Sequence, residues 1–131
     1  MQLKVFQNFL KGLKEPKELG SKGEDIAAIY LKKKGYQIIA RNYKTSSGEI
    51  DIVALDRETV VFIEVKTRAD HSFGYPYEAV HYRKRQKLKN LALLYMKKIG
   101  REVPVRFDVL SIMQNQKGKF EIEHIPDAFE V

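Results

Sequence analysis

GEIDIVALDRETVVFIEVKTR, residues 48–68, is the stretch of sequence that decides the fold. Two segments in it, residues 49–55 and 60–67, are rich in β-branched side chains and flank the polar residues 56–59. This pattern predicts a β-hairpin. The second strand begins with apolar residues on both of its faces, so we expect it to lie inside a sheet that is covered on both sides.

The acidic residues of the hairpin interrupt these apolar rows. Side chains alternate along a strand, so Glu64 and Lys66 share the face of Phe62. An unpartnered carboxylate at the end of a buried row is costly. If the hairpin loop has two or four residues, Asp51 faces Glu64 and Glu49 faces Lys66. A three-residue loop would instead put Asp51 and Glu64 on opposite faces.

Two facing carboxylates near a buried row require a shared proton or a cation, because like charges repel more strongly where the effective dielectric is low. Mg²⁺ prefers oxygen ligands, takes one or two carboxylates and keeps waters that a substrate phosphate can replace. On this hypothesis Asp51 and Glu64 bind Mg²⁺ or Mn²⁺, and Lys66 orients or deprotonates an attacking water. The alternative is structural, with Asp51 at a strand edge and Glu64 and Lys66 forming a surface ion pair.

The rest of the chain predicts elements on either side of this hairpin. Residues 19–34 are predicted to form a helix, with a capping box at Ser21 and Glu24 and a stop at Gly35. Residues 36–43 form a strand, 44–48 a turn, 68–77 a loop, 78–99 a long helix, and 105–113 and 119–125 two closing strands. The order α-β-β-β-α-β-β predicts an α+β fold. We expect one domain, residues 19–131, after an amphipathic extension at residues 1–18.

Composition limits the classes of protein. A length of 131 residues with 44% hydrophobic and 31% charged residues is typical of one globular domain. The sequence has no cysteine, and its three histidines are scattered, so nothing supports a zinc site. No apolar run approaches the roughly 20 residues of a membrane span, and we expect a cytoplasmic protein that does not associate with membranes.

The second helix is strongly basic. Residues 79–101 contain eight lysines and arginines and not one acid, within a chain of net charge +7. Lys84 and Lys87 are predicted to lie on or beside the sheet-facing line of the helix, where they can reach a scissile phosphate. Arg83, Arg85 and Lys89 are better placed to follow a nucleic-acid backbone outside the site. The alternative is a solvated helix face.

Glu24 shares a helical stripe with Ala27, Ala28 and Leu31, so it is predicted to face the sheet. There it could complete a metal shell directly or through water. The alternative is a first-turn acid favoured by the helix dipole. Asp108, in a closing strand beside Phe107, is interpreted as a structural acid that pairs with Arg106 or another basic residue.

Together these residues resemble the PD-(D/E)-x-K nuclease superfamily, with Ile50-Asp51 in place of Pro-Asp. More narrowly, the chain is similar to the YraN family of predicted endonucleases, itself similar to archaeal Holliday junction resolvases. The likeness runs from about residue 19 to residue 129. It is carried by Gly23-Glu24, Gly35-Tyr36, Arg41-Asn42, GEIDIVALD at 48–56, VFIEVKTR at 61–68, Phe73-Gly74, Lys84 and Lys87, and Arg106-Phe107-Asp108.

The resemblance implies a restriction-endonuclease-like αβββαβ core, a central mixed sheet flanked by helices. It also implies divalent-metal hydrolysis of a phosphodiester, with Glu24, Asp51 and Glu64 as metal ligands and Lys66 as the catalytic lysine. DNA is the expected partner, branched or recombination intermediates are favoured by analogy, and the resolvase likeness favours a homodimer. Three rivals stay open: a non-catalytic nucleic-acid-binding module on a nuclease scaffold, an RNA-processing nuclease, and a structural protein with a basic helix.

Overall fold

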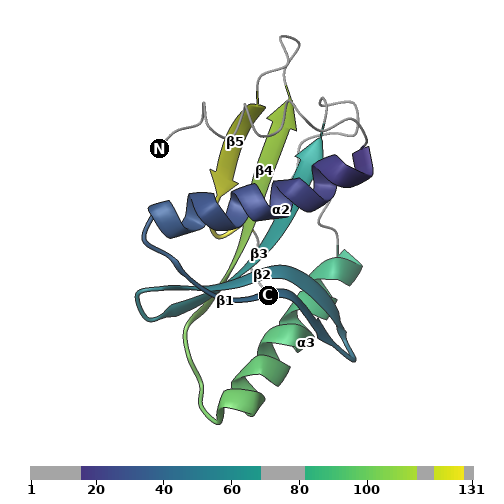
Figure 1. The fold of residues 1–131 in the computed structure, drawn as a ribbon. Helices are drawn as coiled ribbons and strands as arrows, with labels where there is room; N and C mark the ends of the chain where they lie inside the picture. The colour runs from purple at the N-terminus through teal and green to yellow at the C-terminus, as the bar shows by residue number, and fades with distance from the viewer. Residues whose placement is uncertain (1–15, 69–81, 115–119, 129–131) are drawn as a thin grey trace.

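The computed structural model describes residues 16–68, 82–114 and 120–128 (Figure 1). The predicted α+β order is confirmed. The elements are α2 (Pro16–Lys33), β1 (Gln37–Thr45), β2 (Gly48–Asp56), β3 (Thr59–Arg68), α3 (Tyr82–Ile99), β4 (Val105–Gln114) and β5 (Phe120–Ile125). Most of the extension at residues 1–18, the predicted loop after residue 68 and the predicted first turn of the basic helix lie outside the described residues.

The strands form one mixed sheet in the order β1-β2-β3-β4-β5. Neighbours are antiparallel except β3 and β4, which run parallel because α3 connects them. The β2–β3 hairpin has a two-residue loop, since Asp56 pairs with Thr59. The turn between β1 and β2 is shorter than predicted, because Thr45 already pairs with Gly48.

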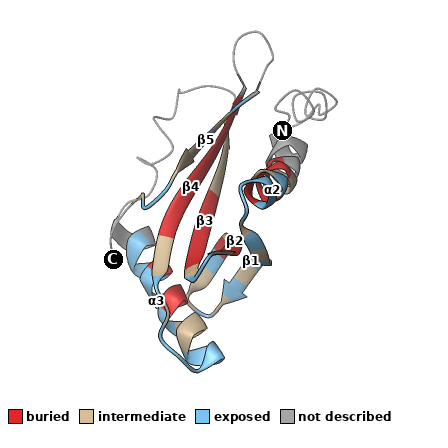
Figure 2. Cartoon of the chain, turned by 90° about the vertical axis from the view of Figure 1, so that its left-hand side faces the viewer, coloured by how far each residue is buried: buried red, intermediate tan, exposed pale blue. Residues whose placement is uncertain are grey.

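The two helices cover opposite faces of the sheet (Figure 1). On one face, α2 contributes Ile26, Ala27, Ala28 and Leu31 to a core that includes Val61 and Ile63 of β3. On the other, Leu88, Leu91 and Ala92 of α3 pack on Val60 and Phe62. Figure 2 shows the buried residues concentrated along β3 and β4. The prediction that β3 lies inside a doubly covered sheet is therefore confirmed.

Both helices end at a glycine. Gly35 has φ +97°, and the amide of Tyr36 donates to the carbonyl of Leu31 (3.0 Å). Gly100 ends α3 in the same way, with the amide of Arg101 donating to the carbonyl of Met96 (3.2 Å). These are Schellman motifs, in which a left-handed residue lets the chain satisfy the last helical carbonyls.

The start of α2 differs from the prediction. The helix begins at Pro16, whose fixed φ suits a first helical position, rather than at Leu19. Ser21 therefore lies inside the helix and cannot cap it, and the predicted capping box is wrong. Glu24 lies more than two turns into the helix, so the reading of Glu24 as a first-turn acid held by the helix dipole is also wrong.

Candidate active site

The β2–β3 ladder stops short of the acidic residues. Its last pair is Ile52 with Ile63; beyond it β2 stays paired with β1, and β3 continues alongside β4. We call this point of divergence the fork. The predicted pair of Asp51 and Glu64 is not part of the ladder, and Glu49 pairs with Lys44 of β1 rather than with Lys66. The two-residue loop is one of the two lengths for which that pairing was expected; the pairing is wrong because the ladder does not extend past residue 52.

Asp51 nevertheless reaches β3 through its side chain. Its Oδ2 accepts a hydrogen bond from the backbone amide of Val65 (2.7 Å), the residue next to Glu64. In a continued ladder Val65 would lie opposite Ile50. The carboxylate of Asp51 thus replaces the missing strand at the fork, where it binds the residue that follows Glu64.

Glu64 and Lys66 follow Phe62 on β3. Glu64 is only 9% exposed, and its Oε1 lies 3.6 Å from Nζ of Lys66. Both side chains are largely shielded from solvent, unlike a surface ion pair between two mobile chains. The fork therefore holds two acids and a lysine within β2 and β3.

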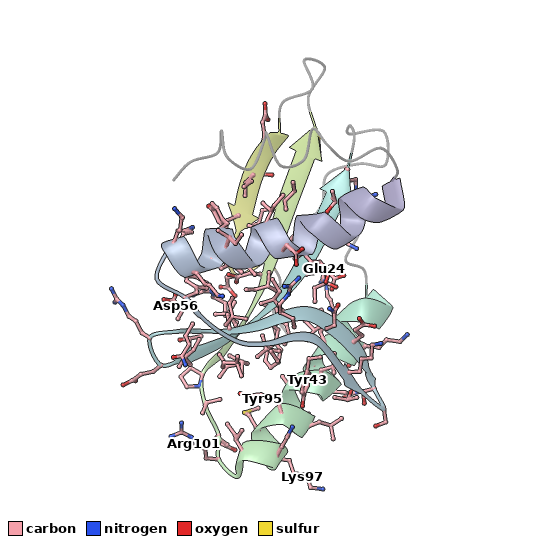
Figure 3. The ribbon with its side chains drawn as sticks, in the orientation of Figure 1. Glu24, Tyr43, Asp56, Tyr95, Lys97 and Arg101 are labelled. Atoms are coloured by element: carbon pink, nitrogen blue, oxygen red, sulfur yellow. The ribbon has the colours of Figure 1, made fainter. Side chains whose placement is uncertain are left out.

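Glu24 approaches the fork from α2, on the sheet-facing side of the helix (Figure 3). Its neighbour Gly23 makes this approach possible, because a Cβ at that position would collide with Oγ1 of Thr67 on β3. Burial raises the pKa of the Glu24 carboxyl, and the nearby Glu49, Asp25 and Glu64 raise it further, while Arg41 opposes them. Arg41 therefore does not outweigh the combined effect of burial and the three acids on the Glu24 carboxyl.

This donor chemistry fits a hard divalent ion. Asp51 and Glu64 offer the one or two carboxylates that Mg²⁺ usually takes, and a cation would favour the ionised form of Glu24, which burial and the nearby acids disfavour. In the described parts of the chain, three or more acids or histidines are not gathered closely enough to form a complete protein cage for a metal. The fit is to a two-carboxylate site with Glu24 nearby, rather than to a closed coordination shell.

Five basic residues of α3 were predicted to contact nucleic acid, and the structure describes the side chains of three of them. Arg85, Lys87 and Lys89 are exposed on the helix, whereas the side chains of Arg83 and Lys84 lie outside the described structure. Cδ of Lys87 is 4.0 Å from where a Cβ would stand on Gly48, at the start of β2. Lys87 therefore extends from the helix to the strand that carries Asp51. The helix itself is anchored by Tyr95, whose ring contacts Tyr43 of β1 edge-on (Figure 3).

Two residues near the site had no predicted function. Arg41 of β1 donates to Asp25 of α2 (2.6 Å) and lowers the pKa of Glu24. Glu49 acts on Glu24 in the opposite direction. A sequence signal for Arg41 existed, since the Arg41-Asn42 pair is one of the motifs that carry the family resemblance, but no spacing rule connects β1 to the middle of α2.

Asp108 belongs to a different cluster, at the hairpin end of the sheet. Its carboxylate is fully buried and accepts hydrogen bonds from Arg106 (2.9 and 3.0 Å), from Nε2 of His124 (2.7 Å) and from the backbone amide of Asp127 (2.9 Å). Arg106 also donates to Asp56 and to the hydroxyl of Tyr36. The prediction that Asp108 pairs with Arg106 is confirmed. His124 is part of this cluster, and His71 and His81 lie outside the described residues.

A mixed sheet between two helices, with acids where β2 and β3 part, defines an α+β protein consistent with a restriction-endonuclease-like core. A model of the Uncharacterised protein family UPF0102 matches residues 23–112. The UPF0102 protein of Thermodesulfovibrio yellowstonii is 51% identical over 112 residues, which cover 86% of this chain and 96% of the relative. That of Syntrophomonas wolfei is 49% identical over 114 residues (86% and 98%), and that of Geotalea uraniireducens 45% over 116 (88% and 91%). The chain belongs to the UPF0102 family.

Neither α2 nor α3, the helices within the described residues, has the length and apolar character that crossing a membrane requires.

Proposed function

We propose that the protein is a divalent-metal-dependent endonuclease of the YraN type that hydrolyses DNA phosphodiesters. The observation that carries this proposal is the fork, where the Asp51 carboxylate binds the amide next to Glu64 and Lys66 lies 3.6 Å from Glu64. A purely structural hairpin would gain from a continued ladder at this point. Here the ladder gives way to two carboxylates and a lysine, which suit phosphoryl chemistry.

Asp51 and Glu64, with Glu24 beside them, would hold Mg²⁺ or Mn²⁺, and the ion would supply charge stabilisation and a more acidic water. As an ammonium, Lys66 donates to a non-bridging phosphate oxygen; as the neutral amine, after losing a proton to solvent, it takes the proton of the attacking water. The water oxygen forms a bond to phosphorus, the bond to one ester oxygen breaks, and that oxygen takes up a proton from solvent or from the Lys66 ammonium. The paired Glu64 carboxylate holds the Lys66 ammonium in place before substrate binds.

The basic face of α3 supports a nucleic-acid substrate. Lys87 spans from the helix to the first residue of β2, so a phosphate bound by its ammonium would lie close to the fork. Arg85 and Lys89 are exposed on the same helix and would contact neighbouring phosphates, a mode that carries no sequence information and weakens with salt. The proposal includes branched DNA as the substrate and a homodimer as the assembly, because of the resemblance to Holliday junction resolvases.

The test is cleavage of linear, forked and four-way DNA, and of matched RNA, with and without Mg²⁺ or Mn²⁺. We expect metal-dependent nicking of DNA that Asp51→Asn and Lys66→Ala each reduce by at least about 100-fold. Glu102→Gln and Lys33→Ala, two exposed positions away from the fork, are the matched controls and should cleave like wild type.

Three results would contradict the proposal. Equal cleavage by wild type, Asp51→Asn and Lys66→Ala would indicate a contaminating nuclease. Cleavage confined to RNA would favour the RNA-processing alternative. DNA binding without cleavage, together with no Mn²⁺ binding by calorimetry in the presence of DNA, would favour a non-catalytic module.

A further inference from the structure

The first strand of the sheet contains an unusual backbone residue directly across from Asp51. Asn42 lies in the middle of β1 with φ +50°, in the left-handed region that non-glycine residues rarely adopt. The pairs on either side are regular, Arg41 with Ile52 and Tyr43 with Ile50, and the register does not shift between them. The left-handed residue therefore lies between two pairs of the β1–β2 ladder, opposite Asp51, and does not change the register.

The two strands change faces at this position. Ile52 lies in the core under α2, and strict alternation would put Ile50 there as well. Ile50 instead belongs to the core under α3, as does Val53. In β1, Ala40 and Tyr43 likewise both pack on the α3 side, although they are three positions apart and strict alternation would put them on opposite faces. The β1–β2 ribbon thus rotates as a unit at Asn42 and Asp51.

This rotation coincides with the fork. Ile52 makes the last β2 pair with β3, and the next residue, Asp51, reaches the amide of Val65 by its side chain. A ribbon that kept its alternation would carry Ile50 on to a place opposite Val65, and the strand would then occupy the position that the carboxylate takes.

We propose that Asn42 is a positioning residue, whose left-handed backbone turns the β1–β2 ribbon and thereby directs the Asp51 carboxylate to the Val65 amide beside Glu64. Its role in catalysis rests on the proposed nuclease function; its role in placing Asp51 does not. Asparagine and glycine tolerate the left-handed region, alanine does so less well, and β-branched residues are the least compatible with it.

The experiment compares Asn42→Val, Asn42→Ala and Asn42→Gly in the full chain. Hydrogen exchange of the Val65 amide, followed by NMR, reports the bond to Asp51, and Asp51→Ala gives the rate with that bond absent. We expect exchange at Val65 to approach the Asp51→Ala rate in Asn42→Val, to lie between in Asn42→Ala, and to match wild type in Asn42→Gly. Metal-dependent cleavage should fall by ~10-fold or more in kcat for Asn42→Val, with little change in KM.

Arg57 provides a matched control. Arg57 is another left-handed non-glycine residue, with φ +59°, but it lies in the hairpin loop between β2 and β3 and not in a strand. Arg57→Val and Arg57→Ala impose the same kind of backbone penalty and should leave exchange at Val65 as in wild type, whatever they do to the melting temperature. If Asn42→Val does not fold, the pair Asn42→Ala and Arg57→Ala carries the comparison.

Wild-type exchange at Val65 in both Asn42→Val and Asn42→Ala would overturn the proposal, as would equal loss of protection in the Asn42 and Arg57 variants. Because this measurement needs neither metal nor DNA, it separates the two hypotheses. A protein that cleaves nothing, but in which the Asn42 variants release the Val65 amide, would refute the nuclease function and leave the positioning role of Asn42 standing.

Discussion

Acidic residues lie at two ends of the same sheet, and their surroundings differ. At the hairpin end, which we call the closed end, Asp108 is surrounded by donors: Arg106, His124 and the amide of Asp127. At the fork, acids are close to other acids, and Lys66 is a largely buried cation beside one of them. Burial alone thus does not explain how the two ends differ; the charges around the acids do.

The pKa directions express this difference. Burial, the largest single influence, raises the pKa of Asp108, but hydrogen bonds from His124, Arg106 and the backbone of Asp127 outweigh it and lower the pKa. For Glu24, burial again acts most strongly and raises the pKa; Arg41 opposes it, and the neighbouring acids add to it, so the pKa is raised. The donors around Asp108 thus outweigh the cost of burying its charge, whereas Arg41 does not outweigh burial and the acids around Glu24.

The histidine at the closed end is held in one tautomer. Nζ of Lys34 lies 3.0 Å from Nδ1 of His124, and a lysine ammonium can only donate, so Nδ1 accepts. Nε2 then carries the proton and donates to Asp108 at 2.7 Å. Each member of this network is oriented by another member, which is the arrangement of a structural centre and leaves little room for a substrate.

The largest effect is expected from breaking the closed end. Asp108→Ala leaves the Arg106 guanidinium without its buried partner, so we expect a loss of about 3–5 kcal/mol in the free energy of unfolding, measured by urea denaturation. Asp25→Ala is the control, because it removes an acid from the exposed Arg41 pair and should cost no more than about 1 kcal/mol. Equal losses in the two variants would show that the closed end is no more important to stability than the surface.

The stability that this network contributes depends on pH. Because the folded pKa of Asp108 is below the ordinary aspartate value of 3.8, its stabilisation is fully present above that pH and is lost as the pH falls through the folded value. Asp108→Asn should therefore show a shallower loss of stability than wild type below about pH 4.

The next largest effect concerns the packing of α2 over the fork. Gly23→Ala adds a methyl group that collides with Thr67, and we expect a net loss of about 1–2 kcal/mol despite the better helix propensity of alanine. Thr67→Ala removes the colliding hydroxyl, so the double variant should recover most of that loss in urea denaturation. Additive losses would mean that α2 does not depend on this close contact, and that Glu24 is placed by other means.

Much of the fold follows from patterns that are local in sequence. β3 was predicted from its doubly apolar run, and the hairpin from residues 56–59. The burial of Ile26, Ala27 and Leu31 followed from helical spacing. Each of these features depends on neighbours within a few residues, where periodicity and turn chemistry determine the result.

The geometry of the fork could not be predicted from the sequence as well as the fold. A constant hairpin register predicted Asp51 opposite Glu64, but the ribbon rotates at Asn42, and no periodicity rule predicts a left-handed residue in the middle of a strand. The Asp108 network joins β4 to β5 and to the end of α2, contacts up to 90 residues apart in sequence for Lys34 and His124. Such contacts depend on the tertiary packing, so the sequence indicated the acid and its arginine but not the rest of the network.

The smallest expected effect concerns the ionisation of Glu24 at the fork and its influence on stability. Because the folded pKa of Glu24 is raised, its ionisation opposes folding, so stability should rise as the pH falls from above the folded value toward the ordinary glutamate value of 4.5. Glu24→Gln removes that penalty, and at pH 7 without metal we expect it to match or exceed wild-type stability by up to about 0.5 kcal/mol.

Adding Mn²⁺ should stabilise wild type more than Glu24→Gln, because the ion offsets charge that the variant no longer carries. A thermal-shift titration of both proteins measures this, with Glu102→Gln as the control. If Mn²⁺ shifts all three equally, Glu24 takes no part in a cation site, and the fork would have to rely on Asp51 and Glu64 alone.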